Sequence, residues 1–349
     1  MTPERIFPGQ PIRNSFAGAV LARDLVLGRE HWSKGRRLSA ADLALLASAP
    51  PSTAGDGVTV LVLEPGDVHE DDAGLRLAAA VSGPGLGRRG PAQSRVDLVA
   101  THPGVVGVAI ARLERLNRID PIEVFTAFDG SVVEPGDLVA SVKIAPHVVA
   151  EATLARAERL ASRGGPIVAV APFLPRRVAV IVKESIHPPA RERFERSVRA
   201  KVEGLGSSIA SIAYVEDDVA AVEGALRAAA GGPDAVDLIL TAGGGSTDPT
   251  DAFFVALSRL GGRVVRRGVP AHPGSMLWLG LVGRAAVLGL PTCGAYSRAT
   301  AADLLLPRLL SGEPPTAATV AKLGHGGILT RDQRFRFPRY ARELDAPDG

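Results

Sequence analysis

The run VAVIV at 178–182 is the first of four similar apolar runs, and IASIAYV (209–215), VDLILTA (236–242) and AAVLGL (285–290) follow it. Each has the length and the β-branched content of a buried strand. The intervening segments carry apolar residues at helical spacing, over about 194–205, 219–229 and 250–260, and another such segment covers about 298–310. A strand, a helix and a further strand within about 30 residues predict a right-handed parallel crossover. The sequence therefore predicts an α/β fold, a three-layer, open and mostly parallel sheet with helices on both faces.

The first 165 residues have shorter elements and more frequent turns. Strands are expected at 58–63, 105–110, 122–127 and 138–144, and helices from Ser39 to Ala47, from Asp67 to Val81 and over 147–163. Ser39-x-x-Asp42 and Asp67-x-x-Glu70 have the spacing of a helix cap, and the Gly- and Pro-rich stretch 82–93 predicts a loop. We expect a β-rich α+β region at 1–165, which could hold two subdomains, an α/β domain at 166–312, and a C-terminal extension at 313–349 that is partly loop.

The composition excludes several classes of protein. Apolar residues make up 46% of the 349 residues, which is enough for a sizeable core. Cys293 is the only cysteine, so neither a disulfide scaffold nor a cysteine-built zinc site fits. The longest apolar stretch, 280–291, contains Arg284 and is too short to cross a bilayer. The N-terminus lacks the apolar segment of a secretion signal, so we expect the reducing cytoplasm and no membrane contact.

The charge balance fits a small anionic ligand. The chain has 40 Lys and Arg against 37 Asp and Glu, a net charge of +3. A nucleic-acid surface usually gathers basic and aromatic residues in one patch. Here paired arginines such as Arg88–Arg89 and Arg266–Arg267 are scattered along the chain, and aromatic residues make up only 4%. We therefore expect no nucleic-acid partner.

The loop after the third predicted strand, TAGGGSTDPTD (241–251), has the residues of a phosphate site. Ligands of open α/β sheets bind beyond the carboxyl ends of the strands, where this loop lies. Glycines let backbone N–H groups approach an anion, and the next helix adds its positive N-terminal end. Asp248 and Asp251 fit a Mg²⁺ ion that bridges to phosphate oxygens. The alternative is a turn in which Asp248 or Thr250 caps the helix. The candidate binding residues are Gly243, Gly244, Gly245, Ser246, Thr247 and Thr250.

Three further loops belong to the same edge of the predicted sheet. The loop 270–280 turns at Pro-Gly ahead of an apolar strand, and its His272 is either a ligand contact or an ordinary loop residue. In the loop 289–298, Cys293 is a nucleophile only with a base beside it, and otherwise a packed thiol. The loop 183–189 offers Lys183 and Glu184 as ligand contacts or as solvated charges. The candidate binding residues of these loops are Pro273, Gly274, Ser275, Pro291, Ser297 and Arg298.

At these loops the chain resembles the molybdopterin-binding (MoaB/Mog-like) domain of molybdenum-cofactor biosynthesis proteins, over about residues 176–311. That domain has a strand ending in Gly-Gly and an Asp seven residues after the second glycine, the spacing of Gly244 and Asp251. A Pro-Gly then leads into an apolar strand, as at Pro273–Gly274, and a Gly-Leu-Pro leads into the last helix, as at Gly289–Leu290–Pro291. The Pro-Gly and Gly-Leu-Pro loops are most similar to the branch that accompanies molybdenum-cofactor nucleotidyltransferases. Less specifically, the N-terminal part resembles the opening of molybdopterin molybdotransferases.

The resemblance implies a ligand, a metal and a reaction class. The ligand is molybdopterin or its adenylylated form, with its phosphate or pyrophosphate in the glycine loop. Mg²⁺ is held by a carboxylate at the position of Asp251, with Asp248 as its partner, and the two serve catalysis. Members of the family adenylylate the pterin or insert molybdate, so an enzyme of this kind is a transferase. Related proteins imply a homodimer or a homotrimer.

Departures from the family pattern affect catalysis more than binding. Molybdotransferases have a Lys shortly after Pro-Gly, where Ser275–Met276 stand here. Gly-Leu-Pro continues as Thr292–Cys293–Gly294 in place of Gly-Asn-Pro, and the first loop has Lys183–Glu184–Ser185 in place of an acidic motif. An acidic partner for Asp251 is evident only if Glu184 or Asp248 serves.

Two functions follow, and the sequence leaves both open. In the first, the protein takes part in cofactor biosynthesis by molybdate insertion or nucleotidyl transfer, through electrostatic stabilisation without a covalent residue. In the second, it is a non-catalytic carrier that hands the cofactor to a nucleotidyltransferase or to an apo-molybdoenzyme. A third reading is an unrelated sugar-phosphate- or nucleotide-binding α/β protein. Turnover by the pure protein, against tight binding without turnover, separates the first two.

Overall fold

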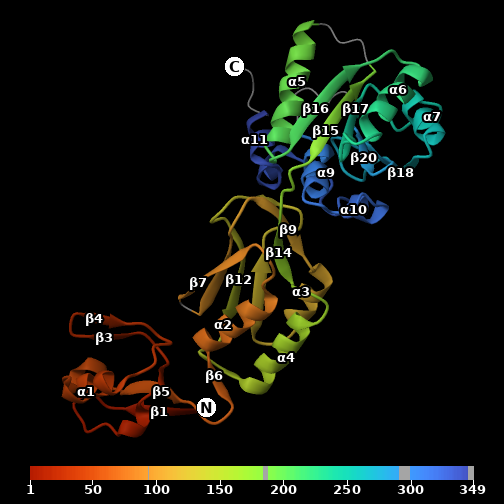
Figure 1. Ribbon diagram of the computed structural model, residues 1–349. Helices are drawn as coiled ribbons and strands as arrows, with labels where there is room; N and C mark the ends of the chain where they lie inside the picture. Colours follow the sequence, from red (N-terminus) through yellow and green to blue (C-terminus); the bar gives the residue numbers. More distant parts are fainter. Residues whose placement is uncertain (93, 184–187, 291–298, 345–349) are drawn as a thin grey trace. The chain divides into compact units, whose positions relative to one another are not determined.

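The computed structural model describes residues 1–92, 94–183, 188–290 and 299–344 (Figure 1). The chain forms two compact units. The first consists of Met1–Thr101, Val108–Ala127 and Pro135–Val170, and the second of His102–Gly107, Phe128–Glu134 and Ala171–Gly349. None of the helices in the described ranges combines the length and the apolar character that a bilayer crossing needs.

The first unit combines small antiparallel sheets with helices, which confirms the predicted β-rich α+β character. Its elements are β1 (Thr2–Ile6), η1 (Asn14–Phe16), β2 (Val20–Leu21), β3 (Leu25–Leu27), β4 (Glu30–Trp32), α1 (Ala40–Ser48), η2 (Pro51–Ala54), β5 (Val58–Val62), β6 (Asp67–His69), α2 (Glu70–Val81), β7 (Leu86–Ala92), β8 (Arg95–Ala100), α3 (Ile110–Leu116), β10 (Ile122–Thr126), β12 (Leu138–Ile144), β13 (Val148–Ala150) and α4 (Glu151–Ser162). The largest sheet has the order β10-β12-β8-β7, and α2 packs against β8, β12 and α4. A further sheet, β11-β9-β14, consists of Val132–Val133, Gly104–Val108 and Val168–Pro172, and all of β11 and most of β9 are assigned to the second unit.

The helix caps of this unit test two sequence predictions. At α1 the capping box is confirmed, because the Ser39 hydroxyl accepts from the N–H of Asp42 and the Asp42 carboxylate accepts from the N–H of Ser39. At α2 the predicted Asp67 cap is wrong. Asp67 lies in β6 and pairs with the N-terminal ammonium of Met1 at 2.6 Å, and His69 caps the helix by accepting from the N–H of Asp71.

The predicted strands of this half are present, but the predicted loop 82–93 is wrong. The strands expected at 58–63, 105–110, 122–127 and 138–144 correspond to β5, β9, β10 and β12. Most of 82–93 forms β7, an edge strand that pairs antiparallel with β8. β7 is largely exposed, so no apolar alternation identifies it in the sequence.

The second unit is built on a six-stranded sheet in the order β16-β15-β17-β20-β19-β18. Its strands are β15 (Arg177–Val182), β16 (Ser208–Tyr214), β17 (Leu238–Ala242), β18 (Arg263–Arg267), β19 (Trp278–Val282) and β20 (Ala285–Gly289). The first four strands in spatial order are parallel, and β19 and β18 are antiparallel to their neighbours. The predicted open, mostly parallel sheet is confirmed, and β18 is an additional edge strand.

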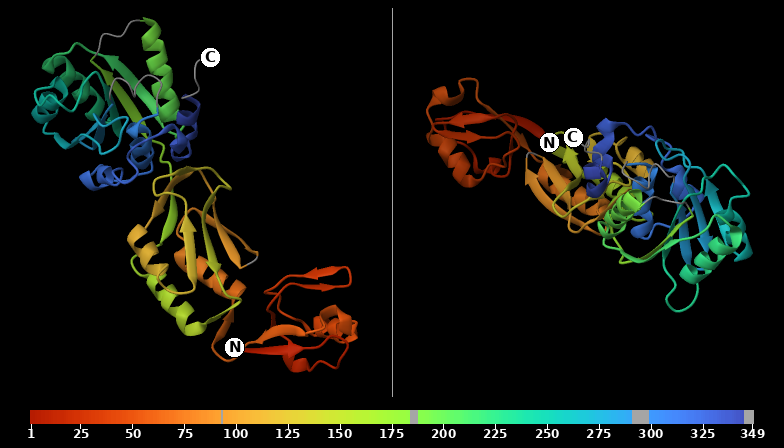
Figure 2. Two further views of the ribbon diagram at one scale, coloured as in Figure 1. Left: turned by 180° about the vertical axis from the view of Figure 1, so that it is seen from behind. Right: turned by 90° about the horizontal axis from the view of Figure 1, so that it is seen from above.

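Helices cover both faces of this sheet. They are α5 (Pro188–Glu203), α6 (Val219–Ala230), α7 (Ala252–Arg259), α9 (Ala301–Leu310), α10 (Ala317–Ala321), η3 (Arg331–Arg336) and α11 (Arg339–Leu344). Alternate residues of β15 face opposite ways, so that Val180 packs with α5 and α9, and Ile181 with α6 and α7. In the left panel of Figure 2 the strands lie between the long green helix α5 and the teal helices α6 and α7. The three-layer prediction is thereby confirmed.

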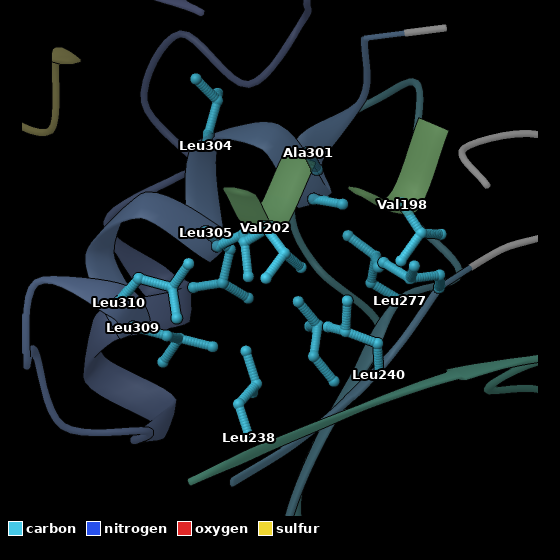
Figure 3. Close-up of a cluster of buried hydrophobic side chains, with 14 of the residues drawn as sticks. Val198, Val202, Leu238, Leu240, Leu277, Ala301, Leu304, Leu305, Leu309 and Leu310 are labelled. Atoms are coloured by element: carbon cyan, nitrogen blue, oxygen red, sulfur yellow. The ribbon is translucent and has the colours of Figure 1, made fainter. Parts of the chain in front are cut away.

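The larger apolar core of the six-stranded sheet lies on the face that α5 and α9 cover (Figure 3). Val198 and Val202 of α5 meet Leu240 of β17 and Leu305 of α9, and all four side chains are fully buried. Burying each such side chain stabilises the fold by roughly 1.5–3 kcal/mol. This packing fixes the strands whose carboxyl ends carry the candidate site.

Candidate functional site

Three charged side chains follow three adjacent strands at the carboxyl edge of the sheet. Because β15 lies between β16 and β17, Lys183, directly after β15, stands between the loops that follow its two neighbours. Those loops carry Asp217 and Asp251. The ladder continues past the strand, since the N–H of Lys183 donates to the carbonyl of Ala242 at 3.1 Å. The parallel topology therefore places a cation between two carboxylates.

Lys183 bridges these carboxylates directly. Its Nζ lies 2.7 Å from Oδ1 of Asp217 and 3.0 Å from Oδ2 of Asp251. The side chains of Lys183 and Asp251 are only 5% and 8% exposed, whereas Asp217 is 63% exposed. The ammonium also lies 5.6 Å from the centre of the Phe253 ring. Lys183 thus has one buried, fixed partner and one partner open to solvent.

The protonation of Lys183 follows from these contacts. Burial alone would lower the pKa of its ammonium, because it penalises the charged form. The hydrogen bonds to Asp217 and Asp251 outweigh that effect and raise the pKa above its ordinary value. Lys183 is therefore a permanent cation at neutral pH.

Asp251 has a second task at the start of α7. Its Oδ1 accepts from the N–H of Phe253 at 2.9 Å, so Asp251 is the N-cap of this helix. The alternative that Asp248 or Thr250 caps the helix is wrong. One carboxylate oxygen caps α7 and the other pairs with Lys183, so both oxygens of Asp251 have partners within the protein.

The glycine loop folds tightly over this carboxylate. Gly243 has φ of +91°, in the region that glycine favours. A Cβ added at Gly244 would lie 3.0 Å from Oδ2 of Asp251 and 2.9 Å from the Phe253 ring. The backbone of the loop therefore approaches the Lys183–Asp251 pair as closely as it can. Any larger residue at 244 would shift the Phe253 ring and crowd the carboxylate of Asp251.

The rest of the loop is more open. Asp248 is exposed, and its Oδ1 accepts from the N–H of Thr250 at 2.8 Å and from its hydroxyl at 2.7 Å. These bonds, with the charge of Lys183, lower the pKa of Asp248. Thr247 is exposed and Ser246 half-buried. Asp248 therefore presents an ionised carboxylate at the surface of the loop.

The Pro-Gly loop supports α9 and also reaches the glycine loop. The carbonyl of Pro273 accepts from the N–H of Ala301 at 2.9 Å. Gly274 has φ of +107°, and a Cβ there would lie 2.8 Å from that nitrogen. Met276, two residues on, brings its methyl to 3.8 Å from the Cβ position of Gly245. The structure thus brings the glycine loop and the Pro-Gly loop together at Gly245.

The remaining predicted contacts have mixed outcomes. Ser275 is exposed, and its carbonyl accepts from the N–H of Val269 at 3.0 Å. His272 is exposed and pairs through its backbone with 327–329, as an ordinary loop residue does. The other predicted contacts, which are Glu184, Pro291, Cys293, Ser297 and Arg298, lie outside the described residues.

Asp217 is the site residue that sequence reasoning missed. The acidic run 216–218 predicts only a favourable charge at a helix N-terminus, and Asp218 fills that role as the N-cap of α6. The signal for Asp217 was its place after the strand that neighbours β15. Asp217 contacts Lys183 because β16 lies next to β15 in the sheet, and the sequence alone does not state this strand order.

The donor set fits a resident Mg²⁺ poorly. Mg²⁺ takes oxygen ligands in near-octahedral geometry and rarely tolerates an ammonium among them. Here the ammonium of Lys183 already contacts Oδ2 of Asp251, and Oδ1 of Asp248 accepts two hydrogen bonds from Thr250. Within the part of the chain that the structure describes, no group of three or more His, Cys, Asp or Glu side chains is arranged to hold a metal.

Comparisons with known proteins find a family match for part of the second unit. Residues 189–311 match the family model MoCF_biosynth, described as a probable molybdopterin binding domain. No curated protein matches the chain. Among solved structures, the chain is similar to the molybdopterin biosynthesis enzyme MoaB from Thermus thermophilus, with 22% identity, 40% of this chain and 99% of that chain covered, and a TM-score of 0.31.

Two other solved structures are similar at lower identity. One is the molybdopterin biosynthesis MoeA protein from Pyrococcus horikoshii, with 16% identity, 71% of this chain and 81% of that chain covered, and a TM-score of 0.31. The other is a molybdopterin biosynthesis protein from Mycobacterium abscessus, with 17% identity, coverage of 34% and 83%, and a TM-score of 0.27. The family match lies on the sheet described above and confirms the predicted resemblance: residues 189–311 of the chain are similar to the probable molybdopterin binding domain of molybdenum-cofactor biosynthesis proteins.

Proposed function

We propose that the carboxyl edge of the sheet in the second unit binds the phosphate group of molybdopterin. The observation that carries the proposal is the buried ammonium of Lys183 beneath a glycine loop, at the N-terminus of α7. A buried cation, loop N–H groups and a helix N-terminus are the elements of a phosphate site. Gly243, Gly244 and Gly245 donate from their backbone, and Ser246, Thr247 and Thr250 add hydroxyls. Met276 offers an apolar contact to the pterin.

We further propose that the protein acts as a carrier of the cofactor. Group transfer to or from a phosphate usually relies on a metal ion or a free catalytic carboxylate. Asp251 can neither bind a metal ion nor act as a free carboxylate, because Lys183 and the N–H of Phe253 occupy its two oxygens. A carrier needs only binding and release to a nucleotidyltransferase or an apo-molybdoenzyme. The expected assembly is a homodimer or a homotrimer, which light scattering coupled to gel filtration measures.

A transferase is the second candidate function, and Asp248 is the observation that favours it. This carboxylate is exposed and its pKa is lowered, so it stays ionised and accessible beside the glycine loop. If Mg²⁺ arrives with the substrate, Asp248 is the carboxylate that is accessible to hold it, because the oxygens of Asp251 are already taken. Turnover of molybdopterin with a nucleotide or with molybdate, by the pure protein, would select this function over the carrier.

Mass spectrometry of the co-purified ligand tests the binding proposal. The protein is isolated anaerobically from a molybdate-replete host as wild type, as Gly244→Asp and as Gly107→Asp. Gly244→Asp adds a negative charge and a clash at the Lys183–Asp251 pair, whereas nothing lies within 4 Å of the Cβ position of Gly107. We expect a dithiolene pterin in the wild type and the Gly107 variant only. A wild-type protein that neither retains nor binds added molybdopterin would refute the assignment.

A further inference from the structure

We infer that Lys183 is the phosphate-binding cation of this site in place of a divalent metal, and that Asp217 is the partner that the phosphate displaces. The inference rests on the proposed function. It starts from the unequal partners of Lys183, since Asp251 is 8% exposed and fixed by its cap on α7, whereas Asp217 is 63% exposed. Only the contact between Lys183 and Asp217 can break without removing the N-cap of α7.

Charge balance explains why one partner must leave. One ammonium between two carboxylates leaves the cluster with a net charge of −1, and Asp248 adds another negative charge nearby. A phosphate dianion is repelled unless a carboxylate withdraws. When Asp217 turns into solvent, the phosphate takes its place on Nζ, while Asp251 remains beneath as the fixed partner of the ammonium. Because Asp217 is 63% exposed, water solvates its carboxylate once it turns away from Nζ, and this solvation offsets the lost contact.

Binding of molybdopterin in two buffers tests this inference and separates it from the proposed function. Wild type and variants are titrated anaerobically, once with EDTA and once with excess MgCl₂. We expect the wild-type affinity to be equal in both. Loss of wild-type binding in EDTA would overturn the inference while leaving the function intact. Absence of binding in both buffers would instead overturn the function.

Three variants sharpen the test. Lys183→Met should weaken binding in EDTA roughly 10- to 100-fold, the worth of a charged hydrogen bond, and MgCl₂ should restore part of the loss because two carboxylates become free. Asp217→Asn should tighten binding up to about fivefold, since it removes the competing anion. Lys322→Met removes an exposed lysine of the same unit and should change nothing. Wild-type affinity in Lys183→Met, or weaker binding in Asp217→Asn, would contradict the inference.

A separate observation carries a second inference, in the first unit. Five arginines line one groove of about 330 Å³ between α3 and α4, with Leu160 as the only other lining residue among those described. Helical spacing produces the arrangement, because residues three, four and seven apart share a helix face. The arginines are Arg112 and Arg115 near α3, and Arg156, Arg159 and Arg163 near α4.

These arginines have few partners in the protein. Arg112 donates to the carbonyls of Gly165 and Pro166 at 2.7 and 2.6 Å, past the end of α4. The other four have no side-chain hydrogen bond or ion pair among the described residues. Both carboxylates of α4, Glu151 and Glu158, are taken by Arg76. Like charges around one groove repel each other, and a bound anion relieves that repulsion.

We propose that this groove binds a small polyphosphate, either inorganic or part of a nucleotide. The surface of the groove is mostly apolar, since the arginine stems and Leu160 form it, and the guanidinium forks of these side chains match phosphate oxygens in pairs. The described lining contains no aromatic ring on which a nucleic-acid base could stack. The observations therefore favour a compact polyanion over a nucleic-acid strand.

Calorimetric titration with inorganic tripolyphosphate, in EDTA and at physiological ionic strength, tests the groove. The double variant Arg156→Ala/Arg159→Ala should weaken one binding event at least about tenfold. The control Arg29→Ala/Arg88→Ala removes the same charge from exposed sites and should not. Lys183→Met identifies any second event at the strand ends. A nucleoside triphosphate in place of tripolyphosphate shows which source binds more tightly. Equal losses in both double variants, or tighter binding of a single-stranded oligonucleotide, would overturn the proposal.

Discussion

At the scale of single residues, Asp251 combines a cap and an ion pair, and substitutions can separate the two. Asparagine caps helices as well as aspartate does, whereas alanine does not. Asp251→Asn therefore loses only the pair with Lys183, and Asp251→Ala also loses the bond to the N–H of Phe253. We expect Asp251→Ala to be less stable than Asp251→Asn by about 0.5–2 kcal/mol in urea unfolding. Equal stabilities would show that the cap contributes nothing.

The pKa of Lys183 predicts a pH profile for ligand binding. The folded state raises the pKa of Lys183 above its ordinary value of 10.5. The ammonium therefore contributes fully to ligand binding below pH 10.5, and this contribution is lost only as the pH rises through the higher pKa of the folded state. Phosphate monoesters lose their second proton near pH 6. Affinity for molybdopterin should therefore rise from pH 5 to about 7 and stay level to about 9. A fall between pH 7 and 9 would require a titrating group other than Lys183.

Single residues also show how far the sequence could predict the site. The spacing from Gly244 to Asp251 identified the glycine loop and the carboxylate, because both lie within one segment of chain. For Lys183 the sequence leaves a ligand contact and a solvated charge open, and for Asp217 it predicts only a favourable charge at the start of a helix. Their contact depends on β15 lying between β16 and β17, and no residue pattern states which strands are neighbours.

At the scale of elements, the central strands of the six-stranded sheet were predicted, whereas the edge strands β7 and β18 and the inner strand β8 were not. β15 and β17 are buried along most or all of their length, so continuous apolar runs mark them. β7 and β18 lie at sheet edges, and their Arg, Gly and Pro content carries no such pattern. Charged residues and proline are common on edge strands, where they prevent further pairing. Sequence periodicity reports burial, so the exposed edge strands β7 and β18 leave little signal, and in β8 the buried Asp97 interrupts the apolar run.

The capping box of α1 gives a prediction for one element. Ser39 and Asp42 satisfy each other's N–H groups, and Asp42 also receives a hydrogen bond from Arg36 at 2.7 Å. Ser39→Ala should cost about 1 kcal/mol of unfolding free energy, the usual worth of an N-cap. Ser48→Ala, at the other end of the helix, is the matched control, and its exposed hydroxyl contacts only a carbonyl of its own helix. Chemical denaturation measures both, and an equal effect of the two would contradict a role for the box.

At the scale of the whole molecule, the two units have separate apolar cores, and that separation predicts how the chain unfolds. Leu46 belongs to a core built from α1, β2 and β5, and Leu305 to the core under α5 and α9, and both are fully buried. Truncating a buried leucine to alanine costs about 2–5 kcal/mol. A loss of this size raises hydrogen exchange throughout the unit that unfolds cooperatively around it.

Hydrogen-exchange mass spectrometry of the two leucine variants therefore tests the division of the chain. Leu46→Ala should speed exchange in α1 and β5 and leave β15 and β17 at their wild-type rates. Leu305→Ala should do the reverse, and it should also weaken molybdopterin binding, because the strands that it loosens carry Lys183 and the glycine loop. Leu46→Ala should leave that affinity unchanged. If either variant accelerated exchange equally in both units, the chain would unfold as one cooperative structure, and ligand binding would respond to any core substitution rather than to the core beneath the site.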